Sequence, residues 1–163
     1  MPLRFDPVTA DAVPALTDLM RTAFDDETRR HTDQDRGGPP GYDDGTLLTR
    51  HAVNNPWAWQ VADERGVVGV VIAFPQGEGR GYLGCLVVAV ERQREGLGRR
   101  ILAELRARLP EVTTWTLDTP ERATSNHRFY EACGFLHVGS RPGDPAIGDL
   151  PSRQYQWDAT HDG

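Results

Sequence analysis

The sequence has 163 residues, of which 38% are hydrophobic, and a net charge of −6 at neutral pH. This length predicts a single domain over residues 1–163, with a disordered tail at 159–163. No apolar run reaches the ~18 residues that cross a bilayer, and Arg4, Asp6 and Asp11 stand where a signal peptide would be apolar. We therefore expect a soluble, cytoplasmic protein that has no membrane partner.

All eighteen basic side chains are arginine. The lack of lysine excludes Schiff-base chemistry and the lysine of a phosphate-binding P-loop. The acidic net charge disfavours a nucleic-acid partner, because such binding depends on a basic surface. Residues 91–108, however, carry six arginines against three glutamates, so one segment of the chain could attract a polyanion.

Hydrophobic periodicity predicts seven strands and four helices. The strands are expected at residues 3–6, 57–62, 67–74, 82–90, 112–117, 135–138 and 154–157. The helices are expected at residues 13–24, 47–52, 96–109 and 125–132. Residues 25–44 are polar and contain clustered glycine and proline, so we expect a long loop there. Such loops in compact domains often belong to a functional site.

The segment after the fourth predicted strand carries the clearest chemical signal. Gly96 and Gly98 lie at a strand-to-helix turn, where glycine permits the close approach of a bound group. Unpaired N–H groups at the start of the following helix attract phosphate. The sequence therefore predicts an anion site. A dinucleotide-binding fingerprint would need a glycine where Ile101 stands, so a Rossmann site is not favoured.

Two sequence blocks resemble one known family. The first, Gln93-Arg94-Glu95-Gly96-Leu97-Gly98, is similar to the pyrophosphate loop Gln/Arg-x-x-Gly-x-Gly/Ala of the GNAT superfamily of acetyl-CoA-dependent N-acetyltransferases. The second block runs from Asn126 to Phe135 and resembles the family's helix that ends in Tyr-Glu-x-x-Gly-Phe, here Tyr130-Glu131-Ala132-Cys133-Gly134-Phe135. The resemblance implies an α/β (α+β) fold, with a mixed central sheet of about seven strands, about four helices, and a fourth and fifth strand that splay apart.

The resemblance also implies how acetyl-CoA, the co-substrate, is bound. Backbone atoms of Leu86, Val87 and Val88 are expected to bond its pantetheine arm. The pyrophosphate is expected to contact Gln93, Arg94, Glu95, Gly96, Leu97, Gly98 and Arg99, and Arg100 would add positive charge. Asn126 is a further candidate, although it lies four residues before Tyr130 and the family's asparagine commonly lies seven before. Asn126 could instead cap its helix.

Acyl transfer to an amine needs a neutral amine, a polarised thioester carbonyl and a proton for the leaving thiolate. The resemblance implies Tyr130 as the general acid and a backbone N–H near Val88 as the group that polarises the carbonyl. The fourth strand lacks the carboxylate that many family members keep there. Asp118 at the end of the next strand resembles the acidic residue that protein N-terminal acetyltransferases of the family use, and is the candidate base, with Glu121, Asp43 and Asp44 as alternatives. Asp118 could instead be a turn residue that caps the segment after it. No histidine pair suggests a metal site.

These features predict an acetyltransferase that transfers acetyl directly to a primary amine. A small basic acceptor is favoured because acidic residues outnumber arginines outside residues 91–108. A peptide or protein N-terminus is an alternative acceptor, supported by the position of Asp118. A non-catalytic acyl-CoA sensor is a second alternative, which would keep the loop and need neither Tyr130 nor a base. A homodimer is one possible assembly.

Overall fold

The computed structural model describes residues 1–144, 146 and 150–159. Its strands are β1 (Arg4–Pro7), β2 (Ala58–Asp63), β3 (Gly66–Gly77), β4 (Arg80–Val88), β5 (Thr114–Pro120), β6 (Leu136–Arg141) and β7 (Ser152–Asp158). Its α-helices are α1 (Val13–His31), α2 (Thr46–His51), α3 (Leu97–Arg108) and α4 (Thr124–Ala132). Short 3-10 turns lie at Ala10–Ala12 (η1) and Val90–Arg92 (η2).

The strands form one mixed sheet in the order β1-β2-β3-β4-β5-β7-β6. β4 and β5 run parallel, whereas β1 and β2, β2 and β3, β5 and β7, and β6 and β7 pair in antiparallel fashion. The predicted α+β fold with a seven-stranded mixed sheet is therefore confirmed. The chain divides into two compact units, one formed by residues 1–73 and 85–108, the other by 74–84 and the described part of 109–163. The prediction of one domain stays a prediction.

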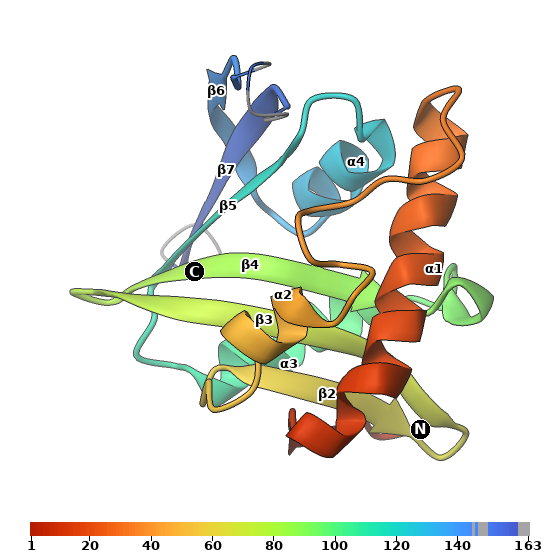
Figure 1. The fold of residues 1–163 in the computed structure, drawn as a ribbon. Helices are drawn as coiled ribbons and strands as arrows, with labels where there is room; N and C mark the ends of the chain where they lie inside the picture. The colour runs from red at the N-terminus through yellow and green to blue at the C-terminus, as the bar shows by residue number, and fades with distance from the viewer. Residues whose placement is uncertain (145, 147–149, 160–163) are drawn as a thin grey trace. The chain divides into compact units, whose positions relative to one another are not determined.

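The core of the first unit is built around β3. Its residues 68–73 are all buried, which is the pattern of a strand covered on both faces. Figure 1 shows α1 and α2 in front of the strands and α3 behind them. Gly69 lies where a Cβ would be 2.3 Å from the carbonyl oxygen of Val87 and 3.5 Å from Cδ1 of Ile101 on α3. Only glycine therefore allows β4 and α3 to approach β3 this closely.

The second unit is organised by β5 and β7, which pair along their whole length from Thr114↔Asp158 to Pro120↔Ser152. Side chains of β5 alternate between buried and part-exposed, with Trp115, Leu117 and Thr119 facing the core. Gly81 on β4 would place a Cβ 2.6 Å from the Trp115 ring, so glycine is needed for β4 to pass that ring.

The parallel register of β4 with β5 is short. In the described part of the chain it consists of three pairs, from Arg80↔Thr114 to Tyr82↔Thr116, although β4 continues to Val88 and β5 to Pro120. The pairing that the structure describes between these two strands therefore involves only their first residues.

The turn between β3 and β4 is tighter than predicted. The sequence suggested a turn over residues 75–81, but β3 extends to Gly77 and β4 begins at Arg80. Gly77, Glu78 and Gly79 all have positive φ angles of 79°, 54° and 74°. Three successive left-handed residues reverse the chain within a short space, so the flanking residues remain in the strands.

The predicted loop over residues 25–44 is wrong at its start, because α1 continues to His31. The extra turns bury polar side chains, which carry no hydrophobic period. The Asp25 carboxylate accepts hydrogen bonds from the Tyr42 hydroxyl (2.6 Å) and the Gly37 N–H (3.1 Å). The buried Thr28 hydroxyl donates to the carbonyl of Gly37 (2.7 Å). The following segment therefore packs on α1 through hydrogen bonds.

The end of the chain is described as far as Ala159, whose N–H donates to the carbonyl of Thr113. The predicted disordered tail otherwise falls on residues 160–163, which lie outside the described residues. Among the described residues, the helices are too short or too polar to cross a bilayer.

We expect Asp25→Ala to lower the free energy of unfolding by about 1–3 kcal/mol, because it leaves the buried Tyr42 hydroxyl and the part-buried Gly37 N–H without their acceptor. Asp26→Ala is the matched control, since Asp26 pairs with Arg30 on a more exposed face of the same helix and should cost less than about 1 kcal/mol. Urea unfolding of both variants measures the difference. Equal losses would show that the contacts of Asp25 do not stabilise the extended helix.

Candidate functional site

The first unit contains the loop that the sequence singled out. β4 ends at Val88, η2 follows at Val90–Arg92, and α3 begins at Leu97. Arg94 and Gly96 adopt left-handed conformations, with φ angles of 69° and 77°. A Cβ at Gly96 would meet nothing within 4 Å, so the bend faces open space. The structure thus places two left-handed residues just before the free N–H groups of the first helical turn.

The side chain of Gln93 fixes the start of this bend. Its amide Nε2 donates to the carbonyl oxygen of Val88 at 3.1 Å, and its backbone N–H donates to the carbonyl of Val90. The hydrogen bonds tie the loop to the end of β4. The Gln93 side chain is therefore bound to the backbone of its own segment.

The arginines of the segment differ in what they contact. Arg94 and Arg99 are exposed, and within residues 1–144, 146 and 150–159 no acidic side chain forms a salt bridge with either. Arg100, expected to add charge near the phosphates, donates to the backbone carbonyl of Met1. Among the described residues, positive charge that has no carboxylate partner therefore lies at Arg94, Arg99 and Arg100.

Arg92 and Asp63 form a buried ion pair that sequence reasoning missed. The Arg92 side chain is 6% exposed and that of Asp63 is fully buried. Two hydrogen bonds join them, Nη1 to Oδ1 (3.2 Å) and Nη2 to Oδ2 (2.5 Å). Arg92 also donates to Glu95 of the loop, from Nε to Oε2 and from Nη2 to Oε1, both at 3.1 Å. No local spacing could reveal this contact, because Asp63 ends a hairpin strand 29 residues earlier.

This ion pair shifts the pKa values of its members. The hydrogen bond from Arg92 is the largest cause that lowers the pKa of Asp63 to about 2, and burial opposes it. The same guanidinium lowers the pKa of Glu95. Both carboxylates are therefore charged at neutral pH, and Arg92 balances one of the two charges.

The pKa of Asp63 predicts how stability depends on acidity. A carboxyl group whose pKa is lower in the folded state stabilises the fold above its unfolded pKa of about 3.9, and loses this effect as the pH falls toward about 2. We expect Asp63→Asn to be less stable than the wild type at neutral pH, with the difference shrinking between about pH 4 and about pH 2. Urea unfolding across this range measures it. A difference that is constant with pH would contradict the assignment.

In the second unit, the candidate base Asp118 lies at the carboxyl end of β5 with two donors on one oxygen. The Tyr82 hydroxyl donates to Oδ2 at 2.9 Å and Arg141 Nη2 donates to it at 3.1 Å. Burial, and then the bond to Asp118, raise the pKa of Tyr82 to about 12. The Asp118 side chain is 21% exposed and that of Arg141 is 54% exposed. Sequence reasoning found Asp118 but neither of these partners.

The candidate acid Tyr130 lies within an aromatic cluster at the end of α4. Its ring centroid is 5.0 Å from that of Phe129, 5.6 Å from Phe135 and 6.4 Å from Tyr155. Gly134 ends the helix with φ of 94°, as its place in the motif predicted, and the Phe135 N–H donates to the carbonyl of Tyr130 (3.0 Å). The cluster therefore fixes the direction of the Tyr130 side chain.

The alternative role for Asn126 as a helix cap is wrong, because the N-cap of α4 is Ala123 and the helix begins at Thr124. Asn126 lies in the first turn, where its side-chain amide donates to the buried hydroxyl of Thr119 (3.2 Å). His127 is buried, with Nε2 2.9 Å from the carbonyl oxygen of Pro120. Both side chains connect α4 to the end of β5.

The alternative bases are engaged elsewhere or exposed. Glu121 accepts a hydrogen bond from Arg153 at 3.0 Å. Asp44 accepts from both the hydroxyl and the N–H of Thr46 at the start of α2, and these bonds lower its pKa, which makes it a weaker base. Asp43 is exposed. Among the described residues, no group of three or more His, Cys, Asp or Glu side chains could hold a metal ion.

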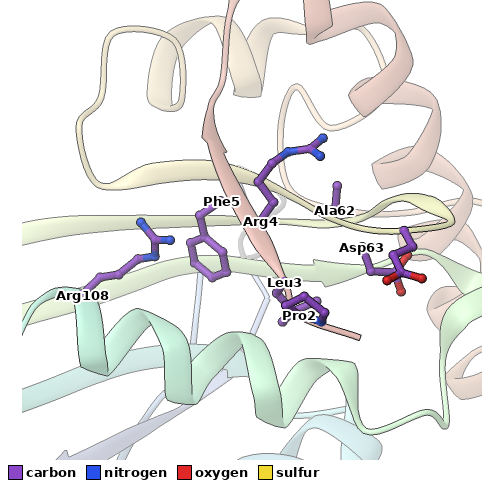
Figure 2. Close-up of a pocket in the computed structure, with 8 residues that line it drawn as sticks. Pro2, Leu3, Arg4, Phe5, Ala62, Asp63 and Arg108 are labelled. Atoms are coloured by element: carbon purple, nitrogen blue, oxygen red, sulfur yellow. The ribbon is translucent and has the colours of Figure 1, made fainter.

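A hollow of about 420 Å³ lies elsewhere in the first unit, beside β1, the end of β2 and the end of α3 (Figure 2). Three of its four charged side chains, Arg4, Asp63 and Arg108, already have partners. Arg4 pairs with Asp6, Arg108 pairs with Glu104 and lies over the Phe5 ring, and Asp63 is bound by Arg92. None of the candidate site residues lines it, so we do not assign the function to this hollow.

Comparison with known proteins identifies the family. A model of the acetyltransferase (GNAT) domain matches residues 55–136, just over half of the chain, including the loop after β4 and all of α4. The chain belongs to the GNAT acetyltransferase family. No curated protein matches the sequence of this GNAT chain.

Solved structures of other acetyltransferases share the fold of this GNAT protein at low sequence identity. The ribosomal-protein-S18-alanine N-acetyltransferase of Escherichia coli aligns with a TM-score of 0.70 and 15% identity, over 97% of this chain and 94% of that one. The PaiA N-acetyltransferase of Thermoplasma acidophilum, in complex with coenzyme A, gives 0.73 and 11%, over 97% and 99%. A spermidine N-acetyltransferase SpeG chimera from Vibrio cholerae and hSSAT gives 0.71 and 13%, over 99% and 98%.

Proposed function

We propose that this GNAT protein transfers an acetyl group from acetyl-CoA directly to a primary amine of a small or peptide acceptor. The observation that carries the proposal is the bend between β4 and α3. There the left-handed Arg94 and Gly96 precede a helix start, and Arg94 and Arg99 are exposed. Backbone N–H groups at such a start bind phosphate oxygens, and guanidinium groups add charge-assisted hydrogen bonds. The residues that would hold the pyrophosphate are Gln93, Arg94, Glu95, Gly96, Leu97, Gly98 and Arg99.

Leu86, Val87 and Val88 are the proposed contacts of the pantetheine arm, and the direction of the β4 backbone supports Val88 among them. Ala89 N–H donates to Val68 on β3, and the Val87 carbonyl packs against Gly69 on β3. Because backbone groups alternate along a strand, those of Val88 point to the opposite edge. The Val88 carbonyl accepts from Gln93 on that edge. The Val88 N–H therefore faces away from β3 and is the candidate donor to the thioester carbonyl.

The acceptor must be neutral to attack. For an amine with a pKa near 10, forming the neutral amine at neutral pH costs about 4 kcal/mol. We assign the proton acceptor to Asp118, whose Oδ2 is bound by Tyr82 and Arg141. An ammonium group can replace the exposed Arg141 as its ion-pair partner, which would bring the acceptor to the carboxylate before it loses its proton.

The leaving thiolate needs a proton, and we assign this proton to the Tyr130 hydroxyl. The aromatic cluster supports the role because it holds the ring in one orientation. Cys85 supports direct transfer over an acyl-cysteine intermediate. Burial raises the pKa of its thiol to about 12, so the nucleophilic thiolate is scarce at neutral pH.

A small basic amine is the favoured acceptor, because acidic residues exceed arginines outside residues 91–108. A peptide N-terminus is the second candidate, and the position of Asp118 supports it. The two are separated by measuring release of free CoA thiol from acetyl-CoA with polyamines, aminoglycosides, amino acids and peptides. Turnover with at least one amine is expected. Binding of acetyl-CoA without turnover across the panel would indicate a sensor instead.

We expect Tyr130→Phe to lower kcat by about 100- to 10,000-fold, because it removes the proposed acid, and to leave the Kd for CoA within about twofold. Tyr155→Phe is the matched control. It changes the same group in the same cluster, where the Tyr155 hydroxyl donates to Glu131 at 2.7 Å. A kcat for Tyr130→Phe equal to that of Tyr155→Phe would reject Tyr130 as the acid.

A further inference from the structure

Three side chains connect the end of β2 to the bend after β4. Asp63 is fully buried at the end of β2, Arg92 lies on η2 with 6% of its side chain exposed, and Glu95 lies in the loop with 37% exposed. The Arg92 guanidinium is a planar fork that contacts both carboxylates through five hydrogen bonds of 2.5 to 3.3 Å. A single ammonium group lacks this planar fork and could not bind the two acids through separate nitrogens in the same geometry.

Glu95 lies at a position where its contact with Arg92 can constrain the backbone of the loop. It lies between Arg94 and Gly96, the two left-handed residues. Left-handed conformations of residues other than glycine persist only where their surroundings hold them. The Gln93 side chain holds the loop on one side of Arg94 through Val88, and Glu95 holds it on the other side through Arg92.

Glu95 also brings a negative charge into a loop proposed to bind pyrophosphate. Two like charges near each other repel. Arg92 holds this carboxylate in an ion pair, and the mostly exposed Arg65 is the next nearest cation, with Nη1 3.9 Å from Oε1. An exposed pair at that distance contributes little. The ion pairing of Glu95 therefore depends mainly on Arg92, which Glu95 shares with Asp63.

We propose that Asp63, Arg92 and Glu95 form a positioning unit for the cofactor loop. Asp63 fixes the Arg92 guanidinium, and Arg92 holds Glu95, so that the bend is ordered before coenzyme A binds and the Glu95 charge is kept from the phosphates. The inference rests on the proposed function, since it assumes that this loop binds pyrophosphate. Whether these three residues order the loop in the free protein can be measured without any ligand.

The test uses Arg92→Lys, which keeps a positive charge beside the buried Asp63 but lacks the planar fork that binds both carboxylates. Hydrogen–deuterium exchange of the free protein should show faster exchange at residues 93–97. The Kd for CoA by calorimetry should rise by about tenfold or more, as expected for one lost charge-assisted hydrogen bond. The double variant Arg92→Lys with Glu95→Gln removes the released charge, and should recover most of the lost affinity.

Arg21→Gln is the matched control, because Arg21 forms an exposed ion pair with Asp18 at the same i,i+3 spacing as Arg92 and Glu95. It should change neither exchange nor Kd. The kcat/KM of Arg92→Lys should fall with acetyl-CoA and stay within about twofold of the wild type with S-acetylpantetheine, which lacks phosphates.

Unchanged exchange at residues 93–97 in Arg92→Lys would overturn the positioning role, whatever the protein binds. A double variant that binds CoA no more tightly than Arg92→Lys would overturn the claim that Arg92 keeps the Glu95 charge from the phosphates. Equal losses with both acetyl donors would show that the effect does not pass through the phosphates. If the wild type binds no CoA, the proposed function fails, and only the exchange result then bears on whether the three residues order the bend.

Discussion

The bend between β4 and α3 is the constraint on which the account depends. Arg94 adopts a left-handed conformation, which costs about 1 kcal/mol or more for a residue with a Cβ. The contacts on either side of it, from Gln93 to Val88 and from Arg92 to Glu95, hold the bend in place. A bend already ordered can present its N–H groups to an anion without a further loss of conformational entropy.

The second unit contributes a different arrangement, built on hydrogen bonds between strands and α4. Asn126 and His127 attach the helix to Thr119 and Pro120 at the end of β5, and Asp118 immediately precedes these residues. The candidate base and the helix that carries Tyr130 are therefore set by the same short segment. Chemistry that needs one group to accept a proton and another to donate one benefits from such shared positioning.

The sequence predicted the elements and motifs that depend on neighbours in the chain. All seven strands were placed within a few residues, because alternating or continuous apolar runs are local signals. The extension of α1 was missed because Asp25 is satisfied by groups 12 and 17 residues away, and a buried polar face has no hydrophobic period. The pairing of Arg92 with Asp63 and of Arg141 with Asp118 was missed for the same reason. Each joins side chains that only the folded sheet brings together.

A crystal structure of this protein with coenzyme A tests the central claim most directly. The account predicts that oxygens of the pyrophosphate lie within hydrogen-bond distance of backbone N–H groups of residues 94–99, with the Glu95 carboxylate still bound to Arg92. Coenzyme A bound with its pyrophosphate away from this bend, or no bound coenzyme A at millimolar concentration, would contradict it.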